Sequence, residues 1–571
     1  MTAMDGSSIT LSTWLGQHNM LTTLIGIVGL FVYIFLNLLE KSIDYKSLRL
    51  PPGPQGWPVV GNLLQLGKLP HQALTDLSKQ YGSLMFLQLG SVPTIVVSSA
   101  EMAEEVFSTQ DHLFASSRPR TLTGEILHYN NRGLILAPLR DQWRFVRRVA
   151  SSNLFPVKRL EQFQLEQPND VGRGELQWLT CKAAVVYEAV HYTESPLKTA
   201  YGGWQEVRRE EILSMVKRAL KEGHDGSVVQ LSKKLHELAY NHTTQMLFGK
   251  SYFGPKSMKS ENYKEAKAFQ NMVASLSSGG FFTGQLREFI PGFRKLDSDV
   301  WDWKLWYFYR VYERFLSAIV KDHRQRPRTT GIQDVVDLIL SLQTEMHRRQ
   351  RTDEHVKALL KDLMTGGTET FSNQVEWTLT ELMRHPEIRQ KVQRELDFVV
   401  GKDRVVEESD LARLKYLHAV VKESFRLHPV LPLCAPMEST IATKIGGYEL
   451  PSKTRVVINL YAIQRDPKIW DNPLAFDPDR FRRRSSDVKG EDFELLPFGA
   501  GRRICVGLNL GLSIVQFTLA QLLHTCDLAL PIGMKCDDVD MEEGCGPTMP
   551  KARPLQVLVT PRLPLRVYKG L

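Results

Sequence analysis

The chain has 571 residues and a formal net charge of +9, with 72 Lys and Arg against 63 Asp and Glu. Because acids and bases are interleaved, no block of positive charge indicates a nucleic-acid partner, and we expect none. The six cysteines include no CxxC pair, so neither a zinc site nor a disulfide framework is indicated. No internal repeat is found, and one large catalytic domain is the better interpretation of the length.

The N-terminal region contains one long apolar run without a charge, Leu21 to Leu39. About 19 helical residues span roughly 28 Å, close to the thickness of a bilayer core. Residues 1–50 are therefore predicted to be a membrane anchor, with a buried core helix as the alternative. Charged residues rather than a cleavage site follow the run, which favours a retained anchor over a removed signal peptide. The excess of Lys and Arg after the run predicts a single pass, with the rest of the chain on the cytosolic side.

A proline-rich stretch, residues 51–58, comes next. Prolines fix φ and exclude helix, so this stretch is predicted to be a stiff, extended hinge before a catalytic domain of residues 59–571. Two apolar runs, 84–89 and 94–98, are separated by Gly90-Ser91-Val92-Pro93 and predict a hairpin.

Trp143 and Arg147 lie four residues apart on a predicted helix. This spacing puts an indole N–H donor and a guanidinium on one face of the helix. Arg144 and Arg148 are expected to face outward, either as solvated charges or as contacts for a partner protein.

Residues 165–205 interrupt the helical pattern with a mixed composition and no single period. We interpret this stretch as an insertion that loops out of the domain, with a functional surface loop as the alternative. After it, amphipathic patterns predict helices over residues 206–247, 262–277 and 300–323.

A long helical pattern over residues 354–384 contains the sequence Gly366-Gly367-Thr368-Glu369-Thr370. Gly is about 1 kcal/mol worse than Ala inside a helix, so a local distortion or the close approach of a ligand is expected there. The alternative for Thr370 is a helix-interior residue whose hydroxyl bonds back onto its own helix.

Glu423 and Arg426 are placed at i, i+3, where a carboxylate and a guanidinium can bond bidentately. Such a pair alone would usually be a surface pair. It precedes Pro478-Asp479-Arg480-Phe481, which adds a further guanidinium.

The stretch from Phe498 to Gly507 sets Cys505 in a glycine-rich loop before an apolar helical run. Glycines let backbone N–H groups approach a thiolate, so the sulfur is placed to act as a metal ligand. A buried cysteine in an ordinary turn is the alternative.

This loop resembles the haem-binding signature of cytochromes P450, FxxGxRxCxG. The resemblance implies the cytochrome P450 fold, mainly α with small β-sheets, here with an N-terminal transmembrane helix. It also implies haem b, with the thiolate of Cys505 as the iron ligand. The signature positions, expected to contact the cofactor, are Phe498, Gly501, Arg503, Cys505 and Gly507.

The other motifs take roles by the same resemblance. Trp143 and Arg147 would bind a haem propionate, and Glu369 and Thr370 would be the acid and the alcohol that deliver protons to bound oxygen. Met437 departs from the family pattern, because many members place His or Arg there toward a propionate. The residues expected to form a structural triad are Glu423, Arg426 and Arg480.

The implied function is that of a haem-thiolate monooxygenase in the endoplasmic reticulum membrane. It would take electrons from NADPH-cytochrome P450 reductase and hydroxylate a small lipophilic substrate. Several stretches look most like plant fatty-acid in-chain hydroxylases of spore and pollen wall synthesis, and some also occur in phenolic and flavonoid hydroxylases. Two alternatives are an isomerase or dehydratase that needs no reductase and, if the insertion is disabling, a non-catalytic haem protein.

Overall fold

A computed structural model of the chain describes residues 48–151, 197–253, 263–264, 267–271, 286–290, 299–326, 334–342 and 353–569. The apolar run Leu21–Leu39 and residues 165–196 of the expected insertion lie outside this part. Within it, no helix is both long and apolar enough to cross a membrane.

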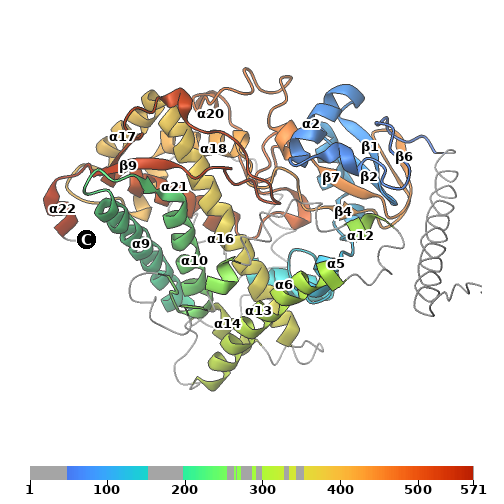
Figure 1. Ribbon diagram of the computed structural model, residues 1–571, viewed down its shortest axis with the longest axis horizontal. Coiled ribbons are helices and arrows are strands. Elements are labelled where there is room, and N and C mark those ends of the chain that lie inside the picture. Colours follow the sequence, from blue (N-terminus) through green and yellow to red (C-terminus); the bar gives the residue numbers. More distant parts are fainter. Residues whose placement is uncertain are drawn as a thin grey trace, which may run out of the picture.

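Helices form one side of the molecule, and a small β-rich lobe forms the other (Figure 1). The longer helices are α2 (Pro70–Tyr81), α6 (Asp141–Val149), α9 (Leu197–Glu222), α10 (Leu231–Phe248), α13 (Asp299–Gln325), α14 (Val335–Ser341), α16 (Asp353–Arg384), α17 (Pro386–Val400), α18 (Lys415–Leu427) and α21 (Leu508–Thr525). Short helical turns are η1 (Leu63–Leu66), α3 (Ala100–Glu104), η2 (Glu105–Thr109), α4 (Asp111–Phe114), α5 (Leu122–Leu127), α12 (Leu286–Phe289), η7 (Glu408–Arg413), α19 (Leu460–Ile463), α20 (Arg480–Arg483), η8 (Gly501–Arg503), η9 (Cys536–Asp538) and α22 (Leu565–Lys569).

Three small sheets lie within the described residues. The largest has the strand order β1-β2-β7-β4, in which β1 and β2 are antiparallel and β2 and β7 are parallel. The predicted hairpin is confirmed, with β2 beginning two residues earlier than expected. The strands are β1 (Leu84–Leu89), β2 (Val92–Val97), β3 (Val229–Gln230), β4 (Met437–Glu438), β5 (Thr443–Ile445), β6 (Tyr448–Leu450), β7 (Arg455–Ile458), β8 (Cys526–Ala529) and β9 (Gln556–Pro561).

The proline-rich stretch lies against β1. The carbonyl of Pro52 accepts the backbone N–H of Phe86 at 2.9 Å. A Cβ on Gly53 would lie 1.9 Å from the carbonyl oxygen of Phe86, so only glycine permits this approach. The stretch is thus joined to the catalytic domain along at least part of its length.

Helix α16 takes part in two separate hydrophobic cores. Its first half, including Leu359 and Leu363, packs with α6, α10, α13 and α14. Its second half, including Val375 and Leu379, packs with α9, α17, α18 and α21. Residues 365–370 belong to neither core, and Gly366 is exposed although buried residues precede and follow it. The middle of α16 is therefore free to face a ligand.

The helix remains continuous through its two glycines, so the expected distortion is wrong. The other explanation for the glycines, the close approach of another group, is correct for Gly367. The group that approaches is a side chain of the protein and not a ligand. The hydroxyl of Thr243 on α10 donates to the carbonyl of Gly367 at 2.7 Å, and a Cβ on Gly367 would lie 3.0 Å from that hydroxyl. A Cβ on Gly366 would meet nothing within 4 Å.

The helix expected over residues 206–247 is in fact two helices. Helix α9 ends at Glu222, and Gly226 adopts a φ of 73° before strand β3 and helix α10. The backbone N–H of Gly226 donates to the carbonyl of Gly223 at 3.0 Å, so a turn separates two helices that the apolar pattern alone would join. Helix α9 begins at Leu197, so residues 197–205 of the expected insertion are helical. The helix predicted over 300–323 is confirmed as α13.

Candidate active site

The loop before α21 holds Cys505 in a fixed position. The backbone N–H of Cys505 donates to the carbonyl of Phe498 at 2.9 Å, which closes the loop. Gly501 has a φ of 66°, and a Cβ there would lie 2.5 Å from the carbonyl oxygen of Phe107. Gly507 caps α21, and a Cβ there would lie 3.9 Å from the sulfur of Cys505. The loop thus presents the thiol at the N-terminus of a helix, where negative charge is favoured.

The Cys505 side chain is accessible from outside, yet enough protein surrounds it for burial to raise the pKa of its thiol. The backbone N–H of Gly507 and the charge of Arg147 lower that pKa. A thiol in such a setting is deprotonated on binding a metal ion, since the metal adds the largest positive charge nearby.

Two arginines flank the ring of Trp143. The guanidinium carbon of Arg503 lies 5.0 Å from the ring centre, and that of Arg147 lies 5.9 Å from it. The indole N–H donates to the carbonyl of Leu134 at 2.8 Å, and is therefore occupied by the protein itself. The structure brings together Trp143, Arg147, Arg503 and Cys505, but it leaves the anion-binding role to the arginines.

Arg503 is only partly satisfied. Its Nε and Nη2 donate to the carbonyls of Ala115 and Ala137, each at 2.7 Å, while its Nη1 is buried without a partner. Burial and the nearby charges of Arg118 and Arg147 lower the pKa of Arg503 to about 9. Excess positive charge at a buried site indicates that an anion belongs there.

Arg118 is a site residue that the sequence did not single out. Its guanidinium donates to the carbonyls of Ala435 and Pro436, the latter at 2.8 Å, and its Nε is buried without a partner. Burial lowers its pKa to about 10. Met437, the departure from the family pattern, follows directly in β4 and is buried. The guanidinium of Arg118, which comes from a distant segment of the chain, thus lies beside Met437, where many family members have His or Arg.

Glu369 and Thr370 lie in the middle of α16. The hydroxyl of Thr370 donates to the carbonyl of Gly366 at 2.6 Å. This is the bond back onto its own helix that we gave as the alternative role of Thr370. Glu369 is buried, and one of its oxygens lies 3.5 Å from the hydroxyl of Thr548. Helix α16 packs directly against α21, the helix that follows Cys505.

Glu423, Arg426 and Arg480 form one buried cluster. Arg480 Nε donates to a Glu423 oxygen at 3.0 Å. The guanidinium of Arg426 also donates to the carbonyls of Gln464, Pro473 and Ala475. These bonds tie α18 to the segment that leads to the Cys505 loop.

A family model described as "Cytochrome P450" matches residues 51–170 and 195–555 of this chain. The chain belongs to the cytochrome P450 family. The match leaves out residues 171–194, which lie within the expected insertion.

Named relatives cover almost the whole of this P450. A flavonoid 3'-monooxygenase of Crocosmia x crocosmiiflora is 37% identical, over 94% of this chain and 99% of its own length. Cytochrome P450 703A2 of Arabidopsis thaliana is 34% identical, over 95% of this chain and 99% of its own length. The structure of a zebra fish cytochrome P450 with abiraterone superposes with a TM-score of 0.65 at 24% identity, covering 87% of this chain and all of that one. The chain is thus a P450 monooxygenase with the P450 fold.

The residues present fit haem b, the cofactor of the family. Haem carries an iron that needs a soft axial ligand and two propionates that need cations. The thiol of Cys505 offers the ligand, and the buried, unpaired N–H groups of Arg503 and Arg118 offer charge-assisted hydrogen bonds. When bound, the haem supplies the oxygen chemistry of the reaction.

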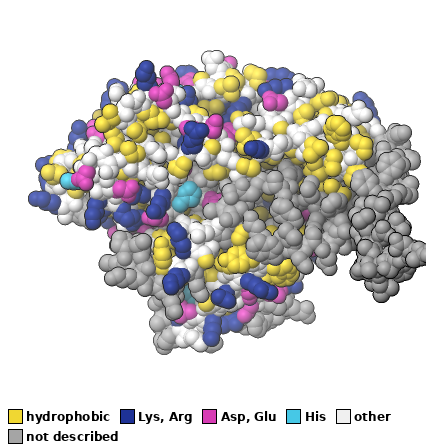
Figure 2. Space-filling view, viewed as in Figure 1, with side chains coloured by type: hydrophobic (Ala, Val, Ile, Leu, Met, Phe, Trp, Pro, Cys, Tyr) yellow, Lys and Arg dark blue, Asp and Glu magenta, His cyan; other side chains and the backbone are white. Residues whose placement is uncertain are grey.

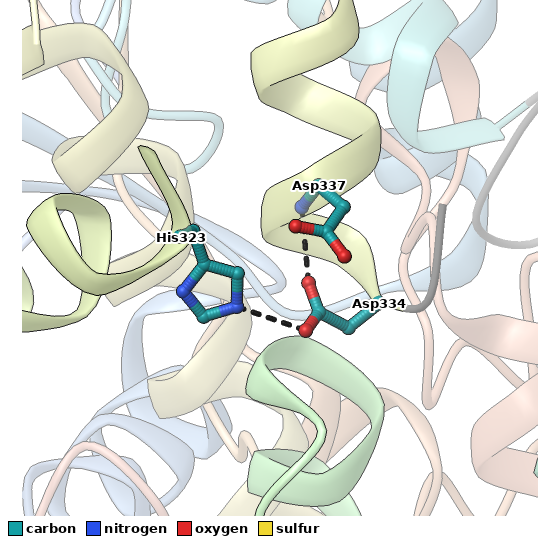
Figure 3. A group of neighbouring side chains, drawn as sticks. All are labelled: His323, Asp334 and Asp337. Atoms are coloured by element: carbon teal, nitrogen blue, oxygen red, sulfur yellow. Dashed lines mark hydrogen bonds and ion pairs between the residues drawn. The ribbon is translucent and has the colours of Figure 1, made fainter. Parts of the chain in front are cut away.

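Two other features are not part of this site. A cavity of about 530 Å³ lies between α9, η7 and α21, but none of the predicted site residues lines it. Figure 3 shows the second feature, a cluster of His323, Asp334 and Asp337 at the end of α13 and the start of α14. The guanidinium of Arg326 already donates to Asp334 at 2.9 Å, and His323 bonds the same carboxylate. This cluster is an ion-pair network that joins two helices, and it needs no metal.

Proposed function

We propose that this P450 hydroxylates a lipophilic small molecule with O₂ and electrons that a separate NADPH-cytochrome P450 reductase supplies. The observation that carries the proposal is the thiol of Cys505 in the same loop as Arg503, whose Nη1, like the Nε of Arg118, is buried without a partner. It is supported by the open middle of α16, where an acid and an alcohol stand next to Gly366. Glu369 and Thr370 are positioned to hold and move protons there.

Two substrate classes are candidates. The sequence stretches favour a medium-chain fatty acid, whereas the printed names of several relatives favour the ring of a flavonoid. The flavonoid 3'-monooxygenase of Arabidopsis thaliana is 35% identical and cytochrome P450 703A2 is 34% identical, so identity does not separate the two. We therefore propose both and test them side by side.

The first test is the reduced, carbon-monoxide-bound absorption spectrum of the full chain. A red-shifted, thiolate-type Soret band is expected, and its loss in Cys505→Ser would identify the ligand. The same preparation with reductase and NADPH is then offered lauric acid or naringenin, and products are identified by mass spectrometry. Turnover of neither compound, in a preparation with the thiolate-type band, would reject both substrate classes while leaving the cofactor assignment intact.

We further propose that residues 21–39 anchor the enzyme in the endoplasmic reticulum membrane, with the catalytic domain in the cytosol. The support is the uncharged apolar run and the positive charges after it. The full chain should stay with microsomes after alkaline carbonate extraction, and added protease should reach the catalytic domain. Release by carbonate would exclude a membrane span.

Exposed arginines are candidates for reductase docking. Arg148 is exposed on α6, Arg144 is exposed beside Asp141, and Arg502 is 53% exposed and paired with Asp111 at 3.0 Å. Reversing the charge of Arg148 to Glu should slow reduction by reductase and leave the dithionite-reduced spectrum unchanged. An unaltered rate of enzymatic reduction would place docking elsewhere.

The alternative of a non-catalytic haem protein is motivated by residues 171–194, which the family model leaves unmatched. We propose that the domain tolerates them, since loop-closure entropy grows only with the logarithm of length. The full chain and a variant lacking residues 171–194 should then give equal thiolate-type bands. A band in the shortened variant alone would show that the insertion is disabling.

A further inference from the structure

The segment between α5 and α6, residues 128–140, has no regular secondary structure of its own. It begins with three consecutive residues in the left-handed region, Tyr129, Asn130 and Asn131, with φ values of 50°, 58° and 57°. Asparagine adopts this conformation more readily than other residues with a side chain, but it is unfavourable for a bulky residue such as Tyr129 and persists there only where surrounding contacts hold it. Contacts on two sides hold the segment in place.

One side of the segment is held by α16. A carboxylate oxygen of Asp362 accepts the backbone N–H of Ile135 at 2.9 Å, and the other lies 3.1 Å from the ring of His128. The segment approaches so closely that a Cβ on Gly133 would lie 2.1 Å from the carboxylate. Lys361 donates to the same histidine ring and pairs with Asp362 at 3.7 Å. Asp362 is 3% exposed, and a buried charge needs a partner. The ammonium group of Lys361 is that partner.

The other side of the segment holds the cofactor site. The carbonyl of Leu134 accepts the indole N–H of Trp143 at 2.8 Å, and the carbonyl of Ala137 accepts Arg503 Nη2 at 2.7 Å. Leu134 and Ile135 are adjacent, so Asp362 and Trp143 bond to neighbouring backbone groups. A shift of the segment away from Asp362 would therefore move the acceptors of Trp143 and Arg503.

We propose that Asp362 is a positioning residue for the cofactor site. It fixes the α5–α6 segment on α16. The segment in turn fixes the ring of Trp143, over which Arg503 lies, and holds the guanidinium of Arg503 in the orientation that receives a propionate. Asp362 acts through the backbone of residues 133–137 and has no contact with the cofactor. The proposal rests on haem binding at Cys505 and is independent of the substrate.

The test compares full-length Asp362→Ala and Asp362→Asn. The alanine variant loses the acceptor for Ile135, and we expect haem transfer to excess apomyoglobin to become about tenfold faster, as for loss of one bond to a charged group. The asparagine variant keeps an acceptor oxygen and should stay within about threefold of the parent chain. The matched control is Glu376→Ala, a buried carboxylate of the same helix that accepts the N–H of Leu555 at 2.8 Å. It should destabilise the fold without changing haem transfer.

A double-mutant cycle with Trp143→Phe separates positioning from general weakening. If Asp362 acts through the segment, the combined variant should lose haem more slowly than the product of the two single effects predicts. Independent, multiplying effects would overturn the proposal, as would equally fast haem transfer in Glu376→Ala. Should Asp362→Ala not fold, Gly133→Ala displaces the segment from the same carboxylate and should speed haem transfer. In the haem-free chain, Asp362→Asn should retain and Asp362→Ala should lose hydrogen-exchange protection at the Ile135 amide, a readout that does not depend on the cofactor.

Discussion

The guanidinium of Arg426 donates two parallel hydrogen bonds to the carboxylate of Glu423, at 2.8 Å and 2.9 Å, and neither side chain has any exposed surface. Removing Arg426 leaves the buried carboxylate of Glu423 with Arg480 as its remaining guanidinium partner and leaves three backbone carbonyls without their donor, which costs about 3 kcal/mol. Arg426→Leu should therefore lower the free energy of unfolding by that amount, measured by urea denaturation. The control is Arg483→Leu, whose pair with Asp477 is largely exposed and should contribute less than about 1 kcal/mol. Equal losses in the two variants would show that the buried pair has no special structural role.

The two glycines of α16 should respond in opposite ways to alanine. Gly366→Ala adds a Cβ that meets nothing within 4 Å and should stabilise the helix by about 1 kcal/mol. Gly367→Ala forces Thr243 away and should destabilise the fold by about 1–3 kcal/mol. The stability of each variant relative to the parent chain is measured by thermal unfolding. A loss of stability in Gly366→Ala would mean that the middle of α16 is not open.

Thr370→Ala tests the monooxygenase against the reductase-independent isomerase or dehydratase. In a monooxygenase, loss of the hydroxyl should reduce product formation roughly a hundredfold while NADPH consumption falls much less, because proton delivery fails after reduction. Both fluxes are measured in one reaction with reductase present. Thr380→Ala is the control, because its hydroxyl also bonds back onto α16, to Glu376 at 2.7 Å, but in the packed half of the helix. Unchanged coupling in Thr370→Ala would favour the isomerase or dehydratase.

His242 on α10 should make the fold sensitive to acid. Burial, with the nearby charge of Arg208, lowers its pKa to about 3, against an unfolded value of about 6.5. Between these values only the unfolded chain binds the proton, so the free energy of unfolding falls as the pH drops from about 6.5 to 3, by up to about 1.4 kcal/mol per pH unit. His242→Leu should flatten this dependence in urea titrations at pH 4–7. A slope as steep in His242→Leu as in the parent chain would show that another group causes the acid sensitivity.

Sequence alone predicted the parts of the site whose residues are close together in the chain. Cys505 and its glycines form one loop, and Glu423 and Arg426 form one helical turn, so spacing indicates their geometry. Arg118 and Asp362 were missed, because their partners lie 317 and 227 residues away in the chain, at Ala435 and Ile135. No local pattern encodes such contacts.

The fold can likewise be divided into elements that short stretches of sequence predict and features that depend on tertiary contacts. The β1–β2 hairpin and helix α16 follow from apolar periodicity and turn residues over short windows. The break between α9 and α10 contains a left-handed residue, Gly226, which periodicity does not register. The indole N–H of Trp143 was assigned to a propionate, and the structure gives it to the carbonyl of Leu134, a choice that only tertiary contacts can make.

The partly buried guanidinium groups of Arg118, Arg147 and Arg503 have a consequence for biosynthesis. Like charges that repel one another inside a protein raise the free energy of the folded state until an anion neutralises them. A ligand that binds only the native state stabilises it in proportion to the logarithm of its concentration over its dissociation constant. The yield of folded enzyme in a host cell should therefore follow the supply of haem, and newly made chains should be most exposed to proteolysis before the cofactor arrives.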